Sequence, residues 1–582
     1  MKMKRNSNDL RTLTALLAGF VCCCALAASV APVAAEHGMV VTAQHLASRV
    51  GVDVLKKGGN AVDAAVAVGY ALAVVYPAAG NLGGGGFMTV QMADGRKTFI
   101  DFREKAPLAA KADMYLDPAG KVIKGLSTDG HLAVAVPGTV AGLEMAREKY
   151  GSLPRAALVA PAIRLAEKGF VLEQGDVDML ESKVEDFKLD PATAAIFLHR
   201  GKPFVVGQML MQQDLAGTLR AISGKGVAGF YKGAVGAAIA ASSKAGGGLI
   251  TQADLDQYQP RERAPIECDY RGFHVVSAPP PSSGGVTLCE MLNVLEGYSL
   301  KDLGFHSAQA VHFQIEVMRH AYVDRNNNLG DPDLVSNPID RLLDKAYAAK
   351  IRAAINPHQA GVSRDIKPGV APHEGSNHEG SNTTHYSIID RWGNAVAVTY
   401  TLNNWFGARV TAAGTGVLLN NEMDDFTSKP GVPNAFGLVQ GAANAIAPGK
   451  RPLSSMCPTI VTRDGKPLLV LGTPGGSRII TAVLQVIVNV VDYGMNVQEA
   501  VDAPRFHQQW LPDVTNVEDF ALSPDTRALL AGMGHHLDAP QPANHVAAII
   551  VVAPSVDGKP VGANRYYGAI DPRINTGQAL GY

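Results

Sequence analysis

The chain of 582 residues has little cysteine, no excess of charge of either sign, and no long apolar run beyond its N-terminus. Lysine and arginine (52) balance aspartate and glutamate (53), so bulk electrostatics gives no reason to expect nucleic acid or an anionic membrane as a partner. Cys268, Cys289 and Cys457 are too few and too far apart to indicate a disulfide framework. No Cys-x-x-Cys or paired-histidine spacing indicates zinc, and we expect neither a metal nor a cofactor.

The N-terminal segment has the pattern of a signal peptide. Basic residues at positions 2–11 precede an apolar run from Leu13 to about Ala31, which also contains the other three cysteines. Val33 and Ala35 then fit a signal-peptidase site. We therefore expect residues 1–35 to be removed and the mature protein to be periplasmic or secreted; an uncleaved membrane anchor is the alternative. No later stretch has the ~20 apolar residues that a membrane-spanning helix needs.

The periodicity of the remaining chain predicts an α+β fold. Asp-Gly turns between alternating segments predict hairpins over 86–103, 459–472 and 546–568. Apolar patterns with helical spacing occupy 61–76, 138–151 and 477–494. Hairpins that are separate from helices favour an architecture of stacked antiparallel sheets that helices cover. They argue against a doubly wound parallel sheet.

One tract, 355–382, lacks any periodicity and contains a tandem His-Glu-Gly-Ser-Asn repeat at 373–382. Structureless segments longer than ~12–15 residues are uncommon inside compact domains and are usually functional or linkers. The histidines of the repeat hint at metal binding, but flexible Gly/Ser spacing preorganises no site. We therefore predict a flexible tail.

A hairpin over 383–407 follows this tail directly. If its pairing is centred on Trp392, Thr383 lies opposite Thr401, although a slip of one residue would change the partner. Inside a chain, Thr383 and Thr384 are ordinary β-branched strand residues. At a new N-terminus, the α-amine of Thr383, with a pKa of ~7.7–8.0, can accept the proton of its own hydroxyl, which turns the residue into a nucleophile.

Other segments supply groups that suit such a nucleophile. Gly475 and Gly476 lead from a strand into a helix, which suits a phosphate site or an oxyanion hole; a threonine nucleophile favours the latter. The cluster 420–426 suits a metal ion, an amino group or a solvated loop. Arg103 is a candidate clamp for a carboxylate. The glycine run 80–87 lacks the strand–turn–helix context of a dinucleotide site, and we interpret it as close backbone packing near the active site.

Together these segments resemble the γ-glutamyltranspeptidase (glutathione hydrolase) family, most of all its bacterial periplasmic form. The matching runs include AGNLGGGGFM, PPPSSGG, TTHYSIID, LLNNEMDDF, KRPLSSMCPT and TPGGSRIIT, in order from near residue 39 to the C-terminus. The resemblance implies an N-terminal-nucleophile hydrolase with a four-layer αββα sandwich. It also implies self-cleavage between Asn382 and Thr383, which yields a large subunit (36–382) and a small catalytic subunit (383–582) that remain together as a heterodimer forming one domain.

The resemblance further implies an activity. Thr383 would attack the γ-carbonyl of glutathione and related compounds, and the resulting γ-glutamyl ester would pass to water or to an amino acid or peptide. Thr401 would support Thr383, and the backbone N–H groups of Gly475 and Gly476 would form the oxyanion hole. The substrate carboxylate would bind to Arg103, Ser454 and Ser455, and its ammonium group to Asn403, Glu422 and Asp425.

The sequence departs from the family pattern at Phe436, in a lid-like loop over 430–441, and at Asn382, where tyrosine and glutamine are frequent. Phenylalanine cannot donate the hydrogen bond that would tie this loop to Asn403. One alternative function is a related acylase acting on glutaryl-substituted β-lactams, which would lack the ammonium pocket. Another is a non-catalytic periplasmic binding protein of the same fold, which would not cleave itself.

Overall fold

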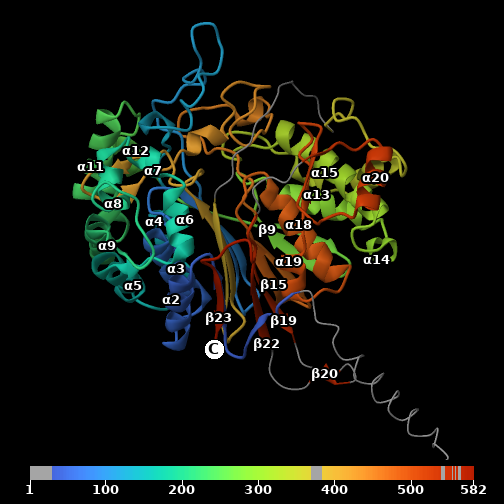
Figure 1. The fold of residues 1–582 in the computed structure, drawn as a ribbon, viewed down its shortest axis with the longest axis horizontal. Coiled ribbons are helices and arrows are strands. Elements are labelled where there is room, and N and C mark those ends of the chain that lie inside the picture. Colours follow the sequence, from blue (N-terminus) through green and yellow to red (C-terminus); the bar gives the residue numbers. More distant parts are fainter. Residues whose placement is uncertain (1–28, 369–382, 539–543, 553–554, 557–558, 561–564) are drawn as a thin grey trace, which may run out of the picture. The chain divides into compact units, whose positions relative to one another are not determined.

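The computed structural model describes residues 29–368, 383–538, 544–552, 555–556, 559–560 and 565–582. Residues 32–582 form one compact unit (Figure 1). Several predicted features lie outside the described residues: most of the signal peptide, the tandem repeat, Asn382, and the turn at Asp557–Gly558.

Two seven-stranded sheets form the centre of the described unit, and every pairing within them is antiparallel. The first has the order β1 (Val33–Ala35), β22 (Arg565–Ile570), β19 (Ala547–Val552), β15 (Lys466–Gly472), β14 (Thr459–Arg463), β9 (Phe273–Ser277) and β8 (Ile266–Tyr270). The second has the order β23 (Gln578–Gly581), β2 (Met39–Thr42), β10 (Thr384–Ile389), β11 (Ala395–Thr401), β3 (Gly85–Gln91), β4 (Lys97–Phe102) and β7 (Arg261–Arg263).

The two sheets pack face to face, with β10 and β11 lying against β15. Small and β-branched side chains fill the space between them, among them Val41, Ala397, Ile460, Val470 and Ile549. Such side chains allow two sheets to approach to about 10 Å. The strand that follows the expected cleavage site is therefore held in the middle of the molecule.

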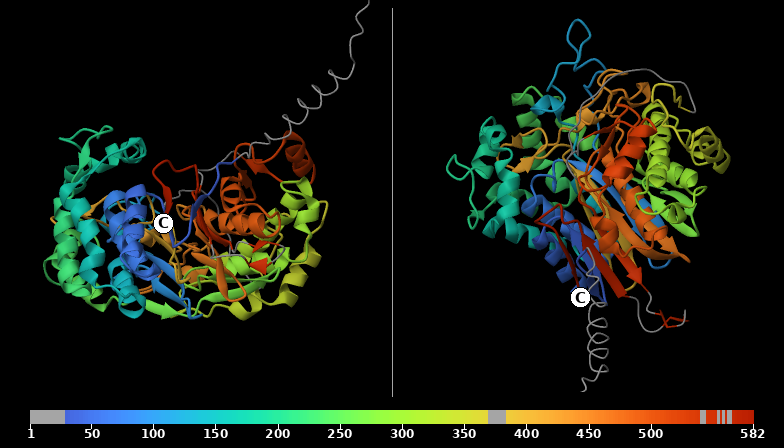
Figure 2. Two further views of the ribbon diagram at one scale, coloured as in Figure 1. Left: turned by 90° about the horizontal axis from the view of Figure 1, so that it is seen from below. Right: turned by 45° about the vertical axis from the view of Figure 1, so that its right-hand side comes forward.

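Helices cover the outer face of each sheet (Figures 1 and 2). On the second sheet lie α2 (His45–Lys56), α3 (Ala61–Val75) and α4 (Thr139–Tyr150). On the first lie α13 (Gly284–Leu295), α18 (Arg478–Val491) and α19 (Val497–Asp502), with α15 (Ala308–Asn328) packed on α13. This arrangement confirms the predicted αββα sandwich.

Local signals position these elements as predicted. The Asn60 and Asp63 side chains form a reciprocal capping box at the start of α3, and all residues of that helix are buried. The hairpins β3–β4, β14–β15 and β19–β22 all form.

The further helices and strands surround this sandwich. The helices are α5 (Arg155–Lys168), α6 (Gln174–Glu181), α7 (Val184–Phe187), α8 (Pro191–Phe197), α9 (Gln213–Lys225), α10 (Val227–Tyr231), α11 (Gly233–Ala245), α12 (Gln252–Gln257), α14 (Leu300–Leu303), α16 (Ile339–Leu342), α17 (Lys345–Ala354) and α20 (Pro524–Gly532). The short strands are β5 (Phe170–Val171), β6 (Met209–Leu210), β12 (Thr411–Ala412), β13 (Val417–Leu418), β16 (Phe506–His507), β17 (Thr515–Val517), β18 (Leu537–Asp538), β20 (Ser555–Val556) and β21 (Lys559–Pro560).

One expectation needs correction. Cys268 in β8 and Cys289 in α13 form a disulfide bond, with their Cα atoms 5.9 Å apart, whereas the sequence indicated no disulfide framework. The packing of α13 against β8 brings the two cysteines together, and spacing alone does not reveal that contact. Cys457 is a buried free thiol.

None of the helices in the described part of the chain is both long and apolar enough to cross a membrane.

Candidate active site

Thr383 immediately precedes β10, in the middle of the second sheet. The β10–β11 register pairs Thr384 with Tyr400 and His385 with Thr399, which is the register centred on Trp392. As predicted, the Thr383 and Thr401 hydroxyls meet, with 3.2 Å between their Oγ1 atoms. Thr383 is only 5% exposed, so its hydroxyl is held in a largely enclosed position.

Thr401 is fixed by the backbone and by the glycine run. The Asn403 backbone N–H donates to Thr401 Oγ1 (2.8 Å), and Asn81 Nδ2 donates to the Thr401 carbonyl oxygen (2.8 Å). A Cβ atom on Gly84 would lie 2.0 Å from that same carbonyl oxygen. The run 80–87 therefore serves close backbone packing beneath the threonine pair, as its sequence context indicated.

A pocket opens at Thr383. Its lining contains all the predicted site residues of the described chain except Gly475: Arg103, Thr383, Thr401, Asn403, Glu422, Asp425, Ser454, Ser455 and Gly476. Segments separated by more than 300 residues thus meet at one place. Arg325, Phe436 and Ser477 also line the pocket.

A buried ion-pair cluster forms one wall. Arg103 follows β4, and its guanidinium group donates to Glu422 and Asp425, which lie on a 3-10 helix over Glu422–Asp425. Burial lowers the pKa of Arg103, but these carboxylates outweigh it and raise that pKa above its ordinary value. Burial raises the pKa of Glu422 well above its usual range despite Arg103. Glu104 lies 3.5 Å from Arg103, and burial raises the pKa of Glu104 to about 7.

This ion-pair cluster has a hydrogen-bond acceptor that a ligand could use. Among the described residues, Glu422 Oε2 has no hydrogen-bond donor although it is buried; such an atom is costly unless a ligand or water pairs with it. A zwitterionic ligand can satisfy it, because an ammonium group supplies donors to the carboxylates while a carboxylate group accepts from Arg103. Asn403 Nδ2 is occupied by the Asn421 carbonyl oxygen (3.0 Å).

The serine pair is anchored by the segment PPPSSGG, for which sequence analysis predicted no chemical role. The Ser283 backbone N–H donates to the Ser454 carbonyl oxygen (2.8 Å), and the Ser454 N–H donates to the Pro281 carbonyl oxygen (2.9 Å). Ser283 Oγ also donates to the Ser454 carbonyl oxygen (2.6 Å). The serine pair therefore has a rigid backbone.

Arg325, on α15, is a pocket residue that sequence reasoning missed. Its guanidinium group donates to Ser283 Oγ (2.8 Å), Asn326 Oδ1 (2.7 Å) and Ser455 Oγ (2.7 Å). Burial lowers the pKa of Arg325 to about 10, so the group stays cationic at neutral pH. The three bonds go to uncharged oxygens, and the positive charge beside Ser455 favours an anion there.

Both glycines before α18 have positive φ angles, 134° for Gly475 and 56° for Gly476, a region that L-residues rarely adopt. A Cβ atom would lie 2.5 Å from the Asn544 side chain at Gly475, and 2.4 Å from the Phe436 ring at Gly476. Phe436 therefore packs directly on the glycine turn. Its loop is tied to the 3-10 helix, because the Ala435 N–H donates to Asp424 Oδ2 (2.9 Å).

Comparison with known proteins agrees with this geometry. The family model described as Gamma-glutamyltranspeptidase matches residues 47–581. The chain is 71% identical over 557 residues to the glutathione hydrolase proenzyme of Pseudomonas sp. (strain A14), covering 96% of each chain. It is 49% identical to the Escherichia coli (strain K12) protein of the same name, covering 95% of this chain and 93% of that one.

Among solved structures, the cephalosporin acylase from Bacillus halodurans superposes with a TM-score of 0.81 at 28% identity, covering 96% of this chain and 98% of that one. The match of the family model to residues 47–581 and the 71% identity over nearly the whole chain show that this protein belongs to the γ-glutamyltranspeptidase family.

Proposed function

We propose that the chain is a precursor that cleaves itself before Thr383 and then transfers γ-glutamyl groups from glutathione and related compounds to water or to an amino acid or peptide. The observation that carries the proposal is the position of Thr383: its hydroxyl lies in a pocket whose wall holds the buried Arg103 and the carboxylates of Glu422, which is buried, and Asp425, which is partly exposed. A γ-glutamyl group is zwitterionic at its α-carbon and needs both charges.

Maturation would begin with attack of Thr383 Oγ1 on the carbonyl carbon of Asn382. An N-to-O acyl shift forms an ester and frees the α-amine of Thr383, and water then hydrolyses the ester to release the new N-terminus. The freed amine is the base that the uncleaved residue lacks. The two subunits, 36–382 and 383–582, would stay together, because β10 and β11 pair with β2 and β3 inside one sheet.

In turnover, the substrate carboxylate would bind to Arg103, Ser454 and Ser455, and the ammonium group to Glu422, Asp425 and Asn403. The amine of Thr383 takes the hydroxyl proton as Oγ1 attacks the γ-carbonyl carbon. The amide C–N bond breaks, the departing amine receives that proton, and a γ-glutamyl ester remains on Thr383. Water or an acceptor amine then repeats the attack and releases the threonine.

The turn at Gly475 and Gly476 would stabilise the oxyanion of the tetrahedral intermediate through backbone N–H groups. Their positive φ angles and the start of α18 favour such a role. Thr401, held by Asn403 and Asn81, would keep the Thr383 hydroxyl oriented. The signal-peptide pattern of residues 1–35 supports a periplasmic or secreted location.

A glutaryl acylase is the main rival, and the name of the Bacillus halodurans structural neighbour favours considering it. Glutaryl and γ-glutamyl groups differ by the ammonium group alone, so Glu422 and Asp425 should discriminate between them. We expect kcat/KM to be at least about 100-fold higher for γ-glutamyl-p-nitroanilide than for glutaryl-p-nitroanilide, since a lost charged hydrogen bond costs about 1.5–3 kcal/mol and a buried unpaired carboxylate more. Equal rates, or faster glutaryl cleavage, would contradict the γ-glutamyl assignment.

A further inference from the structure

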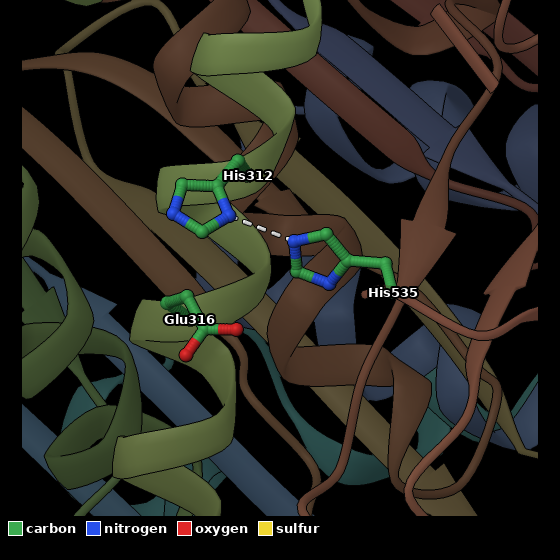
Figure 3. Close-up of side chains that lie close together, drawn as sticks. All are labelled: His312, Glu316 and His535. Carbon is green, nitrogen blue, oxygen red and sulfur yellow. Dashed lines mark hydrogen bonds between the residues drawn. The ribbon is translucent and has the colours of Figure 1, made fainter. Parts of the chain in front are cut away.

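Three buried side chains outside the active-site pocket form a separate cluster (Figure 3). His312 and Glu316 lie one turn apart on the same face of α15, and His535 follows α20. All three are at most 3% exposed, and their candidate ligand atoms lie within 4.8 Å of one another. Two imidazoles and a carboxylate are a donor set typical of zinc sites.

The hydrogen bonds of His312 leave one ring nitrogen directed into the cluster. Nε2 lies 2.8 Å from the Asn356 carbonyl oxygen, which can only accept, so Nε2 carries the proton. In a neutral imidazole, Nδ1 then has the free lone pair, and it points at His535 Nε2, 2.8 Å away. Metal-binding histidines usually donate their second N–H to a carbonyl or carboxylate in this way.

One ring nitrogen of His535 lacks a hydrogen bond within the described residues. If its Nε2–H donates to His312, the lone pair on Nδ1 is left over, and within the described residues this buried nitrogen has no hydrogen-bond partner. Burial lowers the pKa of His535 to about 3 and also lowers that of His312. The hydrogen bonds of the two rings thus leave nitrogen lone pairs available to a metal ion.

The charges around the cluster favour a cation. Glu316 accepts from Arg319 Nε (3.3 Å) and from the Gly361 N–H (3.1 Å). Arg319 is itself paired with Asp513. Two carboxylates, those of buried Glu316 and partly exposed Asp513, thus lie around one guanidinium group.

We propose that His312, Glu316 and His535 bind one divalent transition-metal ion of the Zn²⁺ type. His312 Nδ1 and His535 Nε2 would be ligands, the proton of His535 moving to Nδ1, and a water molecule would complete a tetrahedral set. The nitrogens would separate by about half an ångström, since two ligands at ~2.0–2.1 Å in a tetrahedral site lie about 3.3 Å apart. Asn356, whose carbonyl oxygen contacts His312, is exposed, so the cluster lies close to the surface.

The position of the site suggests what the metal does. His312 and Glu316 precede the proposed cleavage site, and His535 follows it. If cleavage occurs, the ion would cross-link the two subunits and hold residues 356–361 near the start of the tail. This consequence rests on the proposed function, whereas metal binding by the cluster does not.

Metal binding is tested on the full purified protein after dialysis against EDTA. We expect one tight equivalent of Zn²⁺ by calorimetry, a Co²⁺ complex with the visible absorption of a tetrahedral site, and a rise in Tm with Zn²⁺. His535→Gln and Glu316→Gln should each weaken this equivalent at least 10-fold and abolish the Tm rise. Unchanged turnover of γ-glutamyl-p-nitroanilide in Glu316→Gln would establish that this variant is folded.

The matched control removes the two histidines of the tandem repeat, His373 and His378. The His373→Gln/His378→Gln double variant has no histidine in the tandem repeat. It should still bind one equivalent of Zn²⁺ with unchanged affinity. Loss of the tight equivalent in this control, or its retention in both cluster variants, would overturn the proposal. So would the absence of any stoichiometric binding to the wild-type protein, which would leave a neutral histidine pair with a packing role alone.

Discussion

At the scale of single residues, the carboxylate side of the pocket depends on more than Arg103. Arg325 is buried and directs its donors to Ser283, Asn326 and Ser455. A serine hydroxyl that accepts from a guanidinium group has its own proton free to donate elsewhere. In the proposed function, Arg325 would therefore orient Ser455 toward the substrate carboxylate and add a positive charge behind it.

We predict that Arg325→Met raises KM for γ-glutamyl-p-nitroanilide by about 10- to 100-fold, because a hydrogen bond to a charged group contributes about 1.5–3 kcal/mol. Arg325→Lys, which keeps the charge but not the fork of donors, should have an intermediate KM. Steady-state kinetics on both variants, with Tm as a control for folding, checks this. A lower Tm with an unchanged KM would mean that Arg325 only stabilises the fold.

The sequence revealed some of these residues and missed others for a physical reason. Thr383, Thr401 and Arg103 lie at hairpin ends, where local alternation fixes register and position. Arg325 lies within a 21-residue helix, and nothing in its local pattern shows that it faces a pocket. Glu104 adjoins Arg103 in sequence, but its role in the charge cluster depends on Glu422, more than 300 residues away.

At the scale of elements, the loop over 430–441 covers the glycine turn through Phe436. Phe436 and Asn403 line the same pocket. A tyrosine hydroxyl at position 436 would extend into that pocket and is able to bond to the Asn403 side chain, which would hold the loop closed over bound substrate.

We predict that Phe436→Tyr lowers KM for the γ-glutamyl donor by about 2- to 10-fold, the range of one neutral hydrogen bond at about 0.5–1.5 kcal/mol. Phe436→Leu, which keeps an apolar side chain, should not lower KM. Donor kinetics with and without an amino-acid acceptor measures the effect. Identical KM values for the tyrosine and leucine variants would exclude a role for this hydrogen bond.

The disulfide is a second feature at this scale. Cys268–Cys289 joins β8 to α13 across 21 residues of sequence, and closing a loop of this size stabilises a protein by about 2–4 kcal/mol. We predict that reductant lowers Tm, that Cys268→Ser removes this sensitivity, and that Cys457→Ala retains it. Reductant-insensitive unfolding of the wild-type protein would contradict the bond. The sequence did not predict it because the pairing exists only once α13 packs on β8.

At the scale of the whole molecule, the two sheets enclose polar groups that must remain uncharged. His385, in β10, contacts Thr399 and Ser387 and lies against Gly472 of β15. Burial lowers the pKa of His385 to about 3, with a smaller effect from His545. Burial also lowers the pKa of His507 to about 3. Unfolded histidines titrate near ~6.5.

Between about pH 6.5 and pH 3, each of these two histidines therefore binds more protons in the unfolded chain than in the folded one, and its contribution to stability falls as the pH falls. Each such histidine contributes at most about 1.4 kcal/mol per pH unit. We predict that the free energy of unfolding rises less steeply with pH between pH 5 and pH 7.5 in His385→Gln than in the wild-type protein. Urea unfolding at several pH values measures it. A slope that is the same in wild type and variant would show that His385 does not cause the loss.

The global architecture was largely predictable, since Asp-Gly turns, the capping box of α3 and alternating strands all act locally. The order of strands within each sheet could not be predicted, because it depends on contacts between distant segments such as β4 and β7. Residues 369–382 of the tail and residues 1–28 of the signal peptide lie outside the described residues, so the flexible tail and the signal peptide stay predictions.

The central claim is that the amide bond before Thr383 is broken. Intact-mass analysis and N-terminal sequencing of the active wild-type protein test it directly, beside Thr383→Ala as the variant that lacks the nucleophile. We predict two pieces, the smaller beginning Thr-Thr-His-Tyr, and a single uncleaved, inactive chain for the variant. An active wild-type preparation that contains only a full-length chain would contradict the account.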